Sequence, residues 1–327
     1  MAAGHRLEAR LDDAAACKLE TMTLRAPRMQ GKSLELARRV LRLRYWQLLI
    51  NEDLKQKLFV VPVHCAIGHE AIAIAVSDSM GPLDQLVLSH RNLAYNLARA
   101  DGLDGIRDEF LHRGAGLCHG HLGSMNLVNR ARGIVYSSSI LGNNIPVACG
   151  FALAKQVRGL GGVVIVLTGD GAMEEGPFYE GLVFAKSHNL SLVIVVENNN
   201  QSMASTISER RCSISLADLC RSLAIPFATL SGNDVMDYTV EVKRLAERAT
   251  DASTPVCLEV HLAALNQHAG PTPGWPTDPK TISIDNGLTV EPTTSDPVFV
   301  LRRQLGPDLF DELIREVTPG PAQSSRA

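Results

Sequence analysis

The sequence "VVIVLTGDGAMEEGPFYEGLVFAKSHNLSLVIVVENNN", residues 163–200, contains two apolar runs of strand length, and polar residues follow each run. We expect strands at residues 163–168 and 192–197, joined by a helix near residues 178–188. Continuous apolar strands that alternate with helices are typical of a parallel sheet that is covered on both faces. The stretch therefore predicts an α/β fold with a doubly wound, mostly parallel sheet.

The flanking sequence extends this alternation in both directions. We expect helices at 145–157 and 235–249 and a strand at 256–262. Nearer the N-terminus, Ser33 can cap a helix over residues 33–50, with an apolar face that contains Leu34, Ala37, Leu41, Tyr45 and Leu48. The arginines of this helix are expected at a solvated or partner-facing surface, and they are Arg38, Arg39, Arg42 and Arg44. We predict a flexible arm at 1–32, one folded domain at 33–316 and a disordered tail at 317–327.

The composition argues against several classes of function. The 32 basic and 35 acidic residues give a net charge of −3, which provides no global attraction to nucleic acid or anionic membranes. The longest apolar runs are of strand length, so no membrane segment is expected. The N-terminus lacks the apolar stretch of a signal peptide, and a cytoplasmic location is the expectation. Seven cysteines without a CxxC pair favour reduced, mostly buried thiols over a disulfide framework.

The polar residues after the two strands predict a metal site. Asp170 and Asn199 each follow one strand, and the crossover should bring them together beyond the carboxyl edge of the sheet. Gly169 and Gly171 lack side chains, so backbone N–H groups can approach an anion closely. A carboxylate, an amide oxygen and a nearby carbonyl form a partial cage for Mg²⁺, which completes its shell with phosphate and water. The alternative is an ordinary turn followed later by an ordinary polar loop.

The spacing of GDG (169–171) and NN (198–199) resembles the thiamine-diphosphate motif. Residues 36–305 resemble the α subunit of the thiamine-diphosphate-dependent 2-oxo acid dehydrogenases, the pyruvate, branched-chain and acetoin dehydrogenase group. This resemblance implies the diphosphate-binding half of the thiamine-diphosphate fold. It assigns the metal to Asp170, Asn199 and the backbone carbonyl of Gln201. It also makes Met203 the apolar residue that supports the bent cofactor, with a plain core methionine as the alternative.

Three upstream motifs carry the same resemblance. "HCAIGHEA" (64–71) is similar to the family's "HLxxGQEA", which implies that His64 faces the cofactor. "LSHRN" (88–92) is similar to "YRxHG", which assigns the diphosphate to Arg91, a planar and permanently charged fork. "YSSSILGNNIPVACGFALA" (136–154) is similar to "GxxxVGxxxPxAxGxAxA", in which backbone groups around Leu141 hold the aminopyrimidine.

A fourth motif, "PVCLEVHLAALNQHAGPTPG" (255–274), is similar to the family's last strand and catalytic loop, and it aligns His268 with the histidine of that loop. Histidine suits proton handling because its pKa lies near neutrality. The resemblance thus implies that His64 and His268 are catalytic. The full set of cofactor-binding residues that it implies is His64, His90, Arg91, Ser139, Leu141, Gly169, Asp170, Gly171, Ala172, Asn199, Gln201, Met203 and His268.

Several of these residues have other interpretations when they are considered alone. Arg91 would then be a surface arginine, and His268 would be a loop histidine without a role. The "CHGH" sequence (118–121) could indicate a transition-metal site, but no second ligand cluster is visible. His69 stands where the family has glutamine, and we assign it a structural role.

The resemblance implies the α subunit of an enzyme that uses thiamine diphosphate and Mg²⁺ to decarboxylate a 2-oxo acid and to pass the acyl group to lipoamide. The enzyme would be active only with a β subunit that carries the pyrimidine-binding domain, in an α₂β₂ assembly, and a lipoyl acyltransferase is a further candidate partner. Residues 263–265 and 93–94 depart from the family pattern, so the substrate and acceptor stay open. A two-subunit carboligase, transketolase-like or acyloin-forming, is one alternative, because "GDGAMEEG" is similar to the acidic turn of transketolase. A non-catalytic scaffold subunit is the other.

Overall fold

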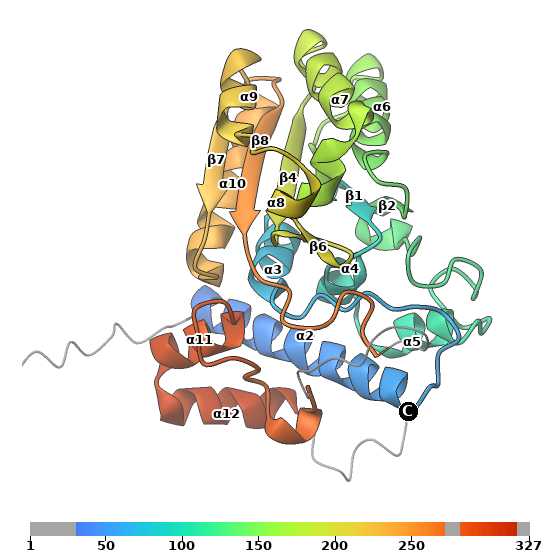
Figure 1. Cartoon of the computed structure of the whole chain (residues 1–327), viewed down its shortest axis with the longest axis vertical. Helices are drawn as coiled ribbons and strands as arrows, with labels where there is room; N and C mark the ends of the chain where they lie inside the picture. The colour runs from blue at the N-terminus through green and yellow to red at the C-terminus, as the bar shows by residue number, and fades with distance from the viewer. Residues whose placement is uncertain (1–30, 272–281, 319–327) are drawn as a thin grey trace, which may run out of the picture.

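The structure is a computed structural model that describes residues 31–271 and 282–318. The predicted N-terminal arm, up to residue 30, and the predicted tail, from residue 319, lie outside the described residues. The described part forms an α/β fold around a six-stranded sheet, which confirms the predicted fold class (Figure 1). Within it, no helix is long and apolar enough to cross a membrane.

All neighbouring strands of the large sheet run parallel. The strand order is β2-β1-β3-β4-β8-β7. The bounds are Gln85–Ser89 (β1), Ile134–Ser138 (β2), Val164–Gly169 (β3), Leu192–Asn198 (β4), Phe227–Leu230 (β7) and Val256–His261 (β8). The chain leaves β1 for β2 on one side and then continues with β3 on the other side. Ligands of such sheets bind beyond the carboxyl ends of the strands at this switch point.

Two apolar cores cover the two faces of the sheet, because successive side chains of a strand point to opposite faces. On β4, Val193 and Val195 belong to one core, while Leu192, Ile194 and Val196 belong to the other. The helices of the first core include α3 (Glu70–Ser79) and α10 (Val235–Asp251). Those of the second core are α6 (Asn144–Val157), α7 (Gly176–Ser187) and α9 (Leu216–Ser222). The apolar runs are thus buried on both faces, as expected.

The predicted elements from residue 145 onward are present, with bounds within two residues of those expected. The N-terminal helix differs more, because α2 spans Lys32–Lys55. The expected cap is wrong, since Gly31 is the N-cap residue and no side-chain capping bond forms. The expected exposure is wrong for Arg44, whose side chain is completely buried.

The wide burial of α2 follows from its neighbours. It packs against α3, α4 (Leu93–Arg99), α11 (Pro297–Leu305) and α12 (Pro307–Val317). Figure 1 shows α2, α11 and α12 grouped at the bottom of the view, on the side toward which the arrowheads of β7 and β8 point. A helix that is covered by several neighbours buries more of its surface than one apolar face. The single apolar face seen in the sequence therefore did not show which residues of α2 are exposed.

Arg44 is paired with two buried carboxylates. Its Nε and Nη2 atoms donate to Glu70 at 2.6 and 2.9 Å, and Nη2 also donates to Asp296 at 3.0 Å. Its Nη1 atom donates to the carbonyl of Leu288 at 2.8 Å. The three charged side chains are fully buried. This network ties α2 to the start of α3 and to the start of α11.

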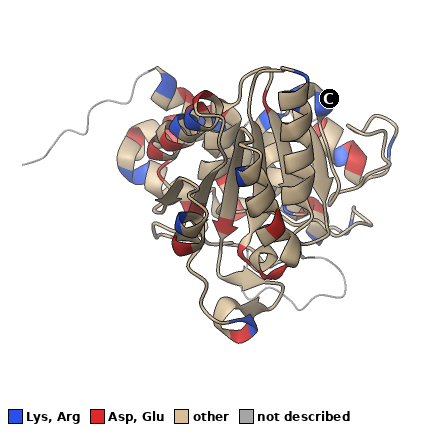
Figure 2. Cartoon of the chain, turned by 90° about the horizontal axis from the view of Figure 1, so that it is seen from above, with Lys and Arg blue, Asp and Glu red and all other residues tan. Residues whose placement is uncertain are grey.

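The remaining described elements are short. They are α5 (Asp104–Phe110), β5 (Gln201–Ser202), β6 (Ser205–Thr206), α8 (Ile207–Arg210) and the 3₁₀ helices η1 (Arg130–Arg132), η2 (Asp170–Glu174) and η3 (Ile284–Asn286). Figure 2 shows basic and acidic residues interspersed over the outer helices. This mixture agrees with the small net charge of −3.

Removing the buried guanidinium should destabilise the fold. Arg44→Ala leaves Glu70 and Asp296 buried without their cation, and we expect the free energy of unfolding to fall by about 3–5 kcal/mol. Urea denaturation of the purified chain measures this change. Arg42→Ala, at an exposed position of the same helix, is the control and should cost less than about 1 kcal/mol. Equal losses in the two variants would contradict the assignment.

Candidate active site

A pocket lies beyond the carboxyl ends of β1, β2, β3 and β4, at the switch point of the sheet. The predicted cofactor-binding residues that line it are His90, Arg91, Leu141, Gly169, Asp170, Gly171, Ala172, Asn199, Gln201 and His268. The strand ladder explains part of this convergence. Gly169 is paired with Glu197 in the parallel ladder of β3 and β4, so the residues after each strand leave the sheet side by side.

The three predicted metal ligands, Asp170, Asn199 and Gln201, face this one pocket. Burial raises the pKa of Asp170, while Arg210 opposes the rise by donating to its Oδ2 atom at 2.9 Å. The Oδ1 atom of Asn199 accepts from the backbone N–H of Gln201 at 2.9 Å, which orients the amide at the start of β5.

The GDG turn packs directly against the residues that follow Asn199. A Cβ atom on Gly171 would lie 2.6 Å from the Oγ atom of Ser202, so this contact requires glycine. The two strand ends therefore form one cradle, with Asp170 on one side and, on the other, Asn199 and Gln201, which carry an amide oxygen and a backbone carbonyl. These are the hard oxygen donors that Mg²⁺ prefers.

Arg91 places a permanent positive charge in the pocket wall. The residue is 6% exposed, and its Nη1 atom donates to the carbonyl of Cys65 at 2.6 Å. Burial lowers its pKa, and the nearby charge of Glu197 opposes that shift. Within the described part of the chain, no carboxylate lies close enough to form an ion pair with Arg91. A buried cation is costly unless an anion compensates it, so this wall is suited to an anionic ligand.

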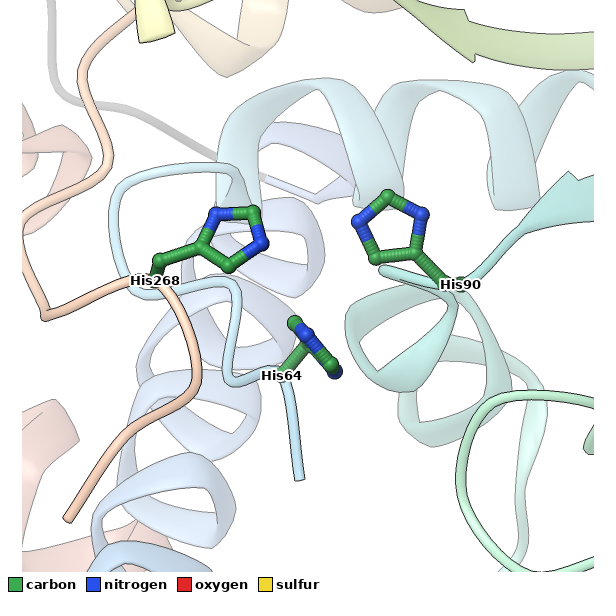
Figure 3. Close-up of side chains that lie close together, drawn as sticks. All are labelled: His64, His90 and His268. Atoms are coloured by element: carbon green, nitrogen blue, oxygen red, sulfur yellow. The ribbon is translucent and has the colours of Figure 1, made fainter. Parts of the chain in front are cut away.

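Three histidines converge in the site (Figure 3), and Arg91 contacts one of them, His268. The ring of His64 lies edge-on to the other two, with centroids 4.9 Å from His90 and 5.1 Å from His268. Burial, followed by the charge of Arg91, lowers the pKa of His64 to about 2 and the pKa values of His90 and His268 to about 4. The three imidazoles are therefore neutral at neutral pH.

The contact with Arg91 determines which nitrogen of His268 carries the proton. The Nη2 atom of Arg91 lies 3.1 Å from Nδ1 of His268, and a guanidinium can only donate. Nδ1 must therefore be the acceptor, and the proton of the neutral ring is on Nε2. His268 consequently presents an N–H donor on the side of the ring away from Arg91.

The three histidines lie close enough together for a metal site to be considered. Their nitrogen atoms lie within 4.8 Å of one another. Arg91, however, occupies Nδ1 of His268 and places a positive charge beside the cluster. The cluster is better suited to hydrogen bonding by neutral rings than to a transition metal.

The "CHGH" segment does not form a metal site among the described residues. Among the described residues, the group of side chains close enough to share a metal consists of His64, His90 and His268, and it does not include Cys118, His119 or His121. The Sγ atom of Cys118 donates to the carbonyl of Val128 at 3.3 Å, and His119 is exposed. The transition-metal alternative at this segment is therefore not supported by the geometry.

The sequence did not single out a buried network at the base of the pocket. The hydroxyl of Tyr95 donates to Glu197 at 2.6 Å, and Nδ1 of His69 lies 3.1 Å from the same oxygen. Burial raises the pKa of Glu197, but His69, Tyr95 and Arg91 together lower it below its ordinary value. Glu197 immediately precedes the asparagine cluster, which is the signal that could have identified it. Tyr95 could be recognised as part of this network only from its tertiary contacts.

Some predicted residues lie outside the pocket wall. Ser139 is exposed, and its neighbours Ser138 and Ile140 line the pocket instead. Met203 is 63% exposed, so the alternative of a core methionine is wrong, and it does not contact the pocket in this structure. His64 lies behind the wall, against the rings of His90 and His268.

Most of the described cysteines are buried, as the sequence suggested. Cys65, Cys149, Cys220 and Cys257 are buried free thiols that form no disulfide, whereas Cys212 is exposed. Cys17 lies outside the described residues.

Comparison with known proteins identifies relatives of this site. Residues 38–274 match the model of a family described as "Dehydrogenase E1 component". The alpha subunit of an acetoin:2,6-dichlorophenolindophenol oxidoreductase of Bacillus subtilis is 29% identical over 230 residues, which cover 70% of this chain and 69% of that one. The corresponding subunit of Cupriavidus necator is 28% identical over 255 residues, with 76% of each chain covered. The mitochondrial pyruvate dehydrogenase E1 component subunit alpha of Saccharomyces cerevisiae is 28% identical over 211 residues, covering 64% of this chain and 49% of that one.

Solved structures show the same fold at lower identity. A transketolase from Campylobacter jejuni superposes with a TM-score of 0.52 at 17% identity, covering 71% of this chain and 38% of that chain. A transketolase from Leishmania mexicana gives a TM-score of 0.50 at 14% identity, with 71% and 37% covered. The chain thus spans less than half of each transketolase chain, and the likeness concerns the fold.

The depressed pKa values predict a loss of stability in acid. The pKa of His90 falls from 6.5 to about 4 on folding, so the unfolded chain binds more protons as the pH falls from 6.5 toward 4. Stability is complete above that window and declines within it, by about 2 kcal/mol between pH 7 and pH 5 for one such group. His90→Asn should reduce this decline when urea unfolding is measured at both pH values. The exposed His121→Asn control should keep it, and a decline of wild-type size in His90→Asn would refute the prediction.

Proposed function

Because the chain belongs to the dehydrogenase E1 component family, we infer that it is the α subunit of a thiamine-diphosphate-dependent 2-oxo acid dehydrogenase and that it acts with a β subunit. The observation that carries this function is one pocket in which the buried Arg91 meets the oxygen donors of Asp170 and Asn199. In a scaffold subunit that binds no anion, the buried cation would lower stability, because removing a cation from water costs free energy.

The residues of the pocket fit thiamine diphosphate and Mg²⁺. Arg91 would hold the diphosphate, because its planar fork matches phosphate oxygens and its charge is otherwise poorly compensated. Asp170, Asn199 and the Gln201 carbonyl would hold Mg²⁺, whose remaining ligands are phosphate oxygens and water. When bound, thiamine diphosphate supplies the electron sink for the loss of carbon dioxide from a 2-oxo acid.

His268 is the group of this chain that we assign to the reacting centre. Its neutral ring offers an Nε2 proton, and the bond from Arg91 prevents the other tautomer. A fixed N–H donor in a buried site stabilises negative charge that develops on a substrate oxygen. His64 packs edge-on against this ring and against His90, so it orients both rings.

A β subunit would complete the site. Ile140 and Leu141 line the pocket, yet they are 67% and 42% exposed. Apolar side chains at the mouth of a polar pocket are suited to burial by a partner. We propose an α₂β₂ assembly in which the β subunit supplies the half of the site that binds the pyrimidine ring.

The proposal also extends to the identity of the substrate and of the acyl acceptor. The names of the relatives refer to acetoin and pyruvate. We propose a short 2-oxo acid as the substrate and a lipoyl group of an acyltransferase as the acceptor. Leu265, which departs from the family pattern, is buried in the apolar core, so this departure does not by itself reshape the pocket wall.

Cofactor binding tests the proposed function. Isothermal titration of thiamine diphosphate with Mg²⁺ should show tight binding to the chain co-purified with its β subunit and much weaker binding to the chain alone. Asp170→Ala in the complex should abolish the Mg²⁺-dependent part, because the carboxylate ligand is lost. Wild-type affinity in that variant would remove Asp170 from the metal site. Turnover assays of the active complex with pyruvate or acetoin, and with lipoamide or an aldehyde as acceptor, then separate the dehydrogenase from a carboligase.

Replacing His268 should affect turnover more than binding. In the assembled enzyme, His268→Ala should reduce kcat by about 10²–10⁴-fold while the cofactor affinity is retained. His268→Gln keeps a neutral N–H donor and should recover part of the loss. Steady-state kinetics and calorimetry measure the two effects. Turnover that is unchanged in His268→Ala would exclude His268 from the reaction.

A further inference from the structure

Arg210 makes the closest cationic contact to the predicted metal site. It is the last residue of α8 (Ile207–Arg210), and its side chain is 13% exposed. Its Nη2 atom donates to Oδ2 of Asp170 at 2.9 Å, and its Nε atom donates to Glu174 at 2.9 Å. Its Nη1 atom donates to the backbone carbonyl of Ser205. One guanidinium thus binds three acceptors.

These acceptors lie on the two opposite halves of the metal cradle. Asp170 and Glu174 belong to η2, directly after β3. Ser205 belongs to β6, which pairs with β5, and β5 begins at Gln201, whose carbonyl is the predicted third ligand. Arg210 therefore links the half that carries the carboxylate to the half that carries the carbonyl.

We propose that Arg210 is a positioning residue for the divalent metal, because its guanidinium holds Asp170 and the β5–β6 hairpin in a fixed arrangement before the metal binds. This role rests on the proposed function, which places Mg²⁺ between Asp170, Asn199 and Gln201. Carboxylates that bind a metal are themselves oriented by hydrogen bonds from neighbouring groups, and the loss of such a bond usually weakens metal binding.

The positive charge of Arg210 would by itself repel a divalent cation, so the balance of charge around it matters. Glu174 accepts from Arg210 on another edge of the guanidinium, and Glu174 also pairs with Arg211 at 3.2 Å. The charge of Arg210 is thus shared between two carboxylates. Each oxygen of Asp170 has more than one lone pair, so the bond from Arg210 leaves acceptor sites on that carboxylate for a metal. We therefore expect the fixed orientation of Asp170 to strengthen metal binding by more than the repulsion from Arg210 weakens it.

Arg211 provides a matched control. It has the same charge, is adjacent in sequence and is also largely buried, with a side chain that is 10% exposed. It pairs with Glu174 in the described structure and not with Asp170. Arg210→Ala and Arg211→Ala therefore remove the same charge from nearly the same place, and only Arg210→Ala removes the link between the two halves of the cradle.

The experiment is a titration of Mn²⁺, which reports its own binding in electron paramagnetic resonance, into the complex of this chain and its β subunit with saturating thiamine diphosphate. We expect Arg210→Ala to weaken Mn²⁺ binding by about 10–100-fold. Arg211→Ala should stay within about 3-fold of the wild type. Arg210→Lys keeps the charge but not the fork, so it should also bind Mn²⁺ more weakly than the wild type. At saturating metal, kcat should be nearly unchanged, because the effect is on assembly of the site.

Four outcomes would overturn this role, the last of them together with the proposed function. Mn²⁺ binding that is unchanged or tighter in Arg210→Ala would show that Arg210 is indifferent to the metal or competes with it. Equal losses in the two alanine variants would show an effect of charge alone. If Arg210→Ala does not assemble, Arg210→Lys decides the question, and wild-type affinity in that variant overturns the role. A wild-type complex that binds neither Mn²⁺ nor thiamine diphosphate would instead refute the proposed function itself, and the positioning role with it.

Discussion

The parallel pairing of β3 with β4 is the constraint on which the site depends. Gly169 stands opposite Glu197 in this ladder, so the acidic turn and the asparagine cluster leave the sheet together. A slip of one residue would move Asn199 by about 3.3 Å along the strand. It would also turn the side chains of β4 from each close-packed core into the other. The packing of the two cores therefore sets the geometry of the proposed metal cradle.

Hydrogen bonds to one backbone carbonyl position the charged wall of the pocket. The carbonyl of Cys65 accepts from Arg91 at 2.6 Å and from the side-chain amide of Asn266 at 3.1 Å. The side-chain oxygen of Asn266 in turn accepts from the N–H of Ile67 at 3.0 Å. Three loops that are distant in sequence thus form one unit that carries Arg91 and His268. Polar groups that are held in place before the ligand arrives need little reorganisation during the reaction.

Much of the sheet could be predicted because continuous apolar strands are a local signal. The elements from residue 145 onward follow from that signal. For α2, the same kind of local signal predicted the helix but not the burial of its side chains. The apolar stripe of α2 suggested an exposed Arg44, but Glu70 and Asp296 enclose this side chain from positions 26 and 252 residues away in the sequence. The pattern of one helix cannot show how many neighbours cover it. The contacts of α2 with α3 and with the start of α11 are therefore the reason why the prediction for Arg44 is wrong.

The sequence by itself determined which chemical groups follow the strands: the carboxylate of Asp170, the amide of Asn199, and the motif positions of Arg91 and His268. Only the tertiary structure decided the state and partners of those groups. It made His268 neutral and assigned its proton to Nε2, and it placed Arg210 against Asp170. The physical reason is that spacing along the chain determines where a strand ends. Protonation and hydrogen bonding depend instead on burial and on atoms that distant segments contribute.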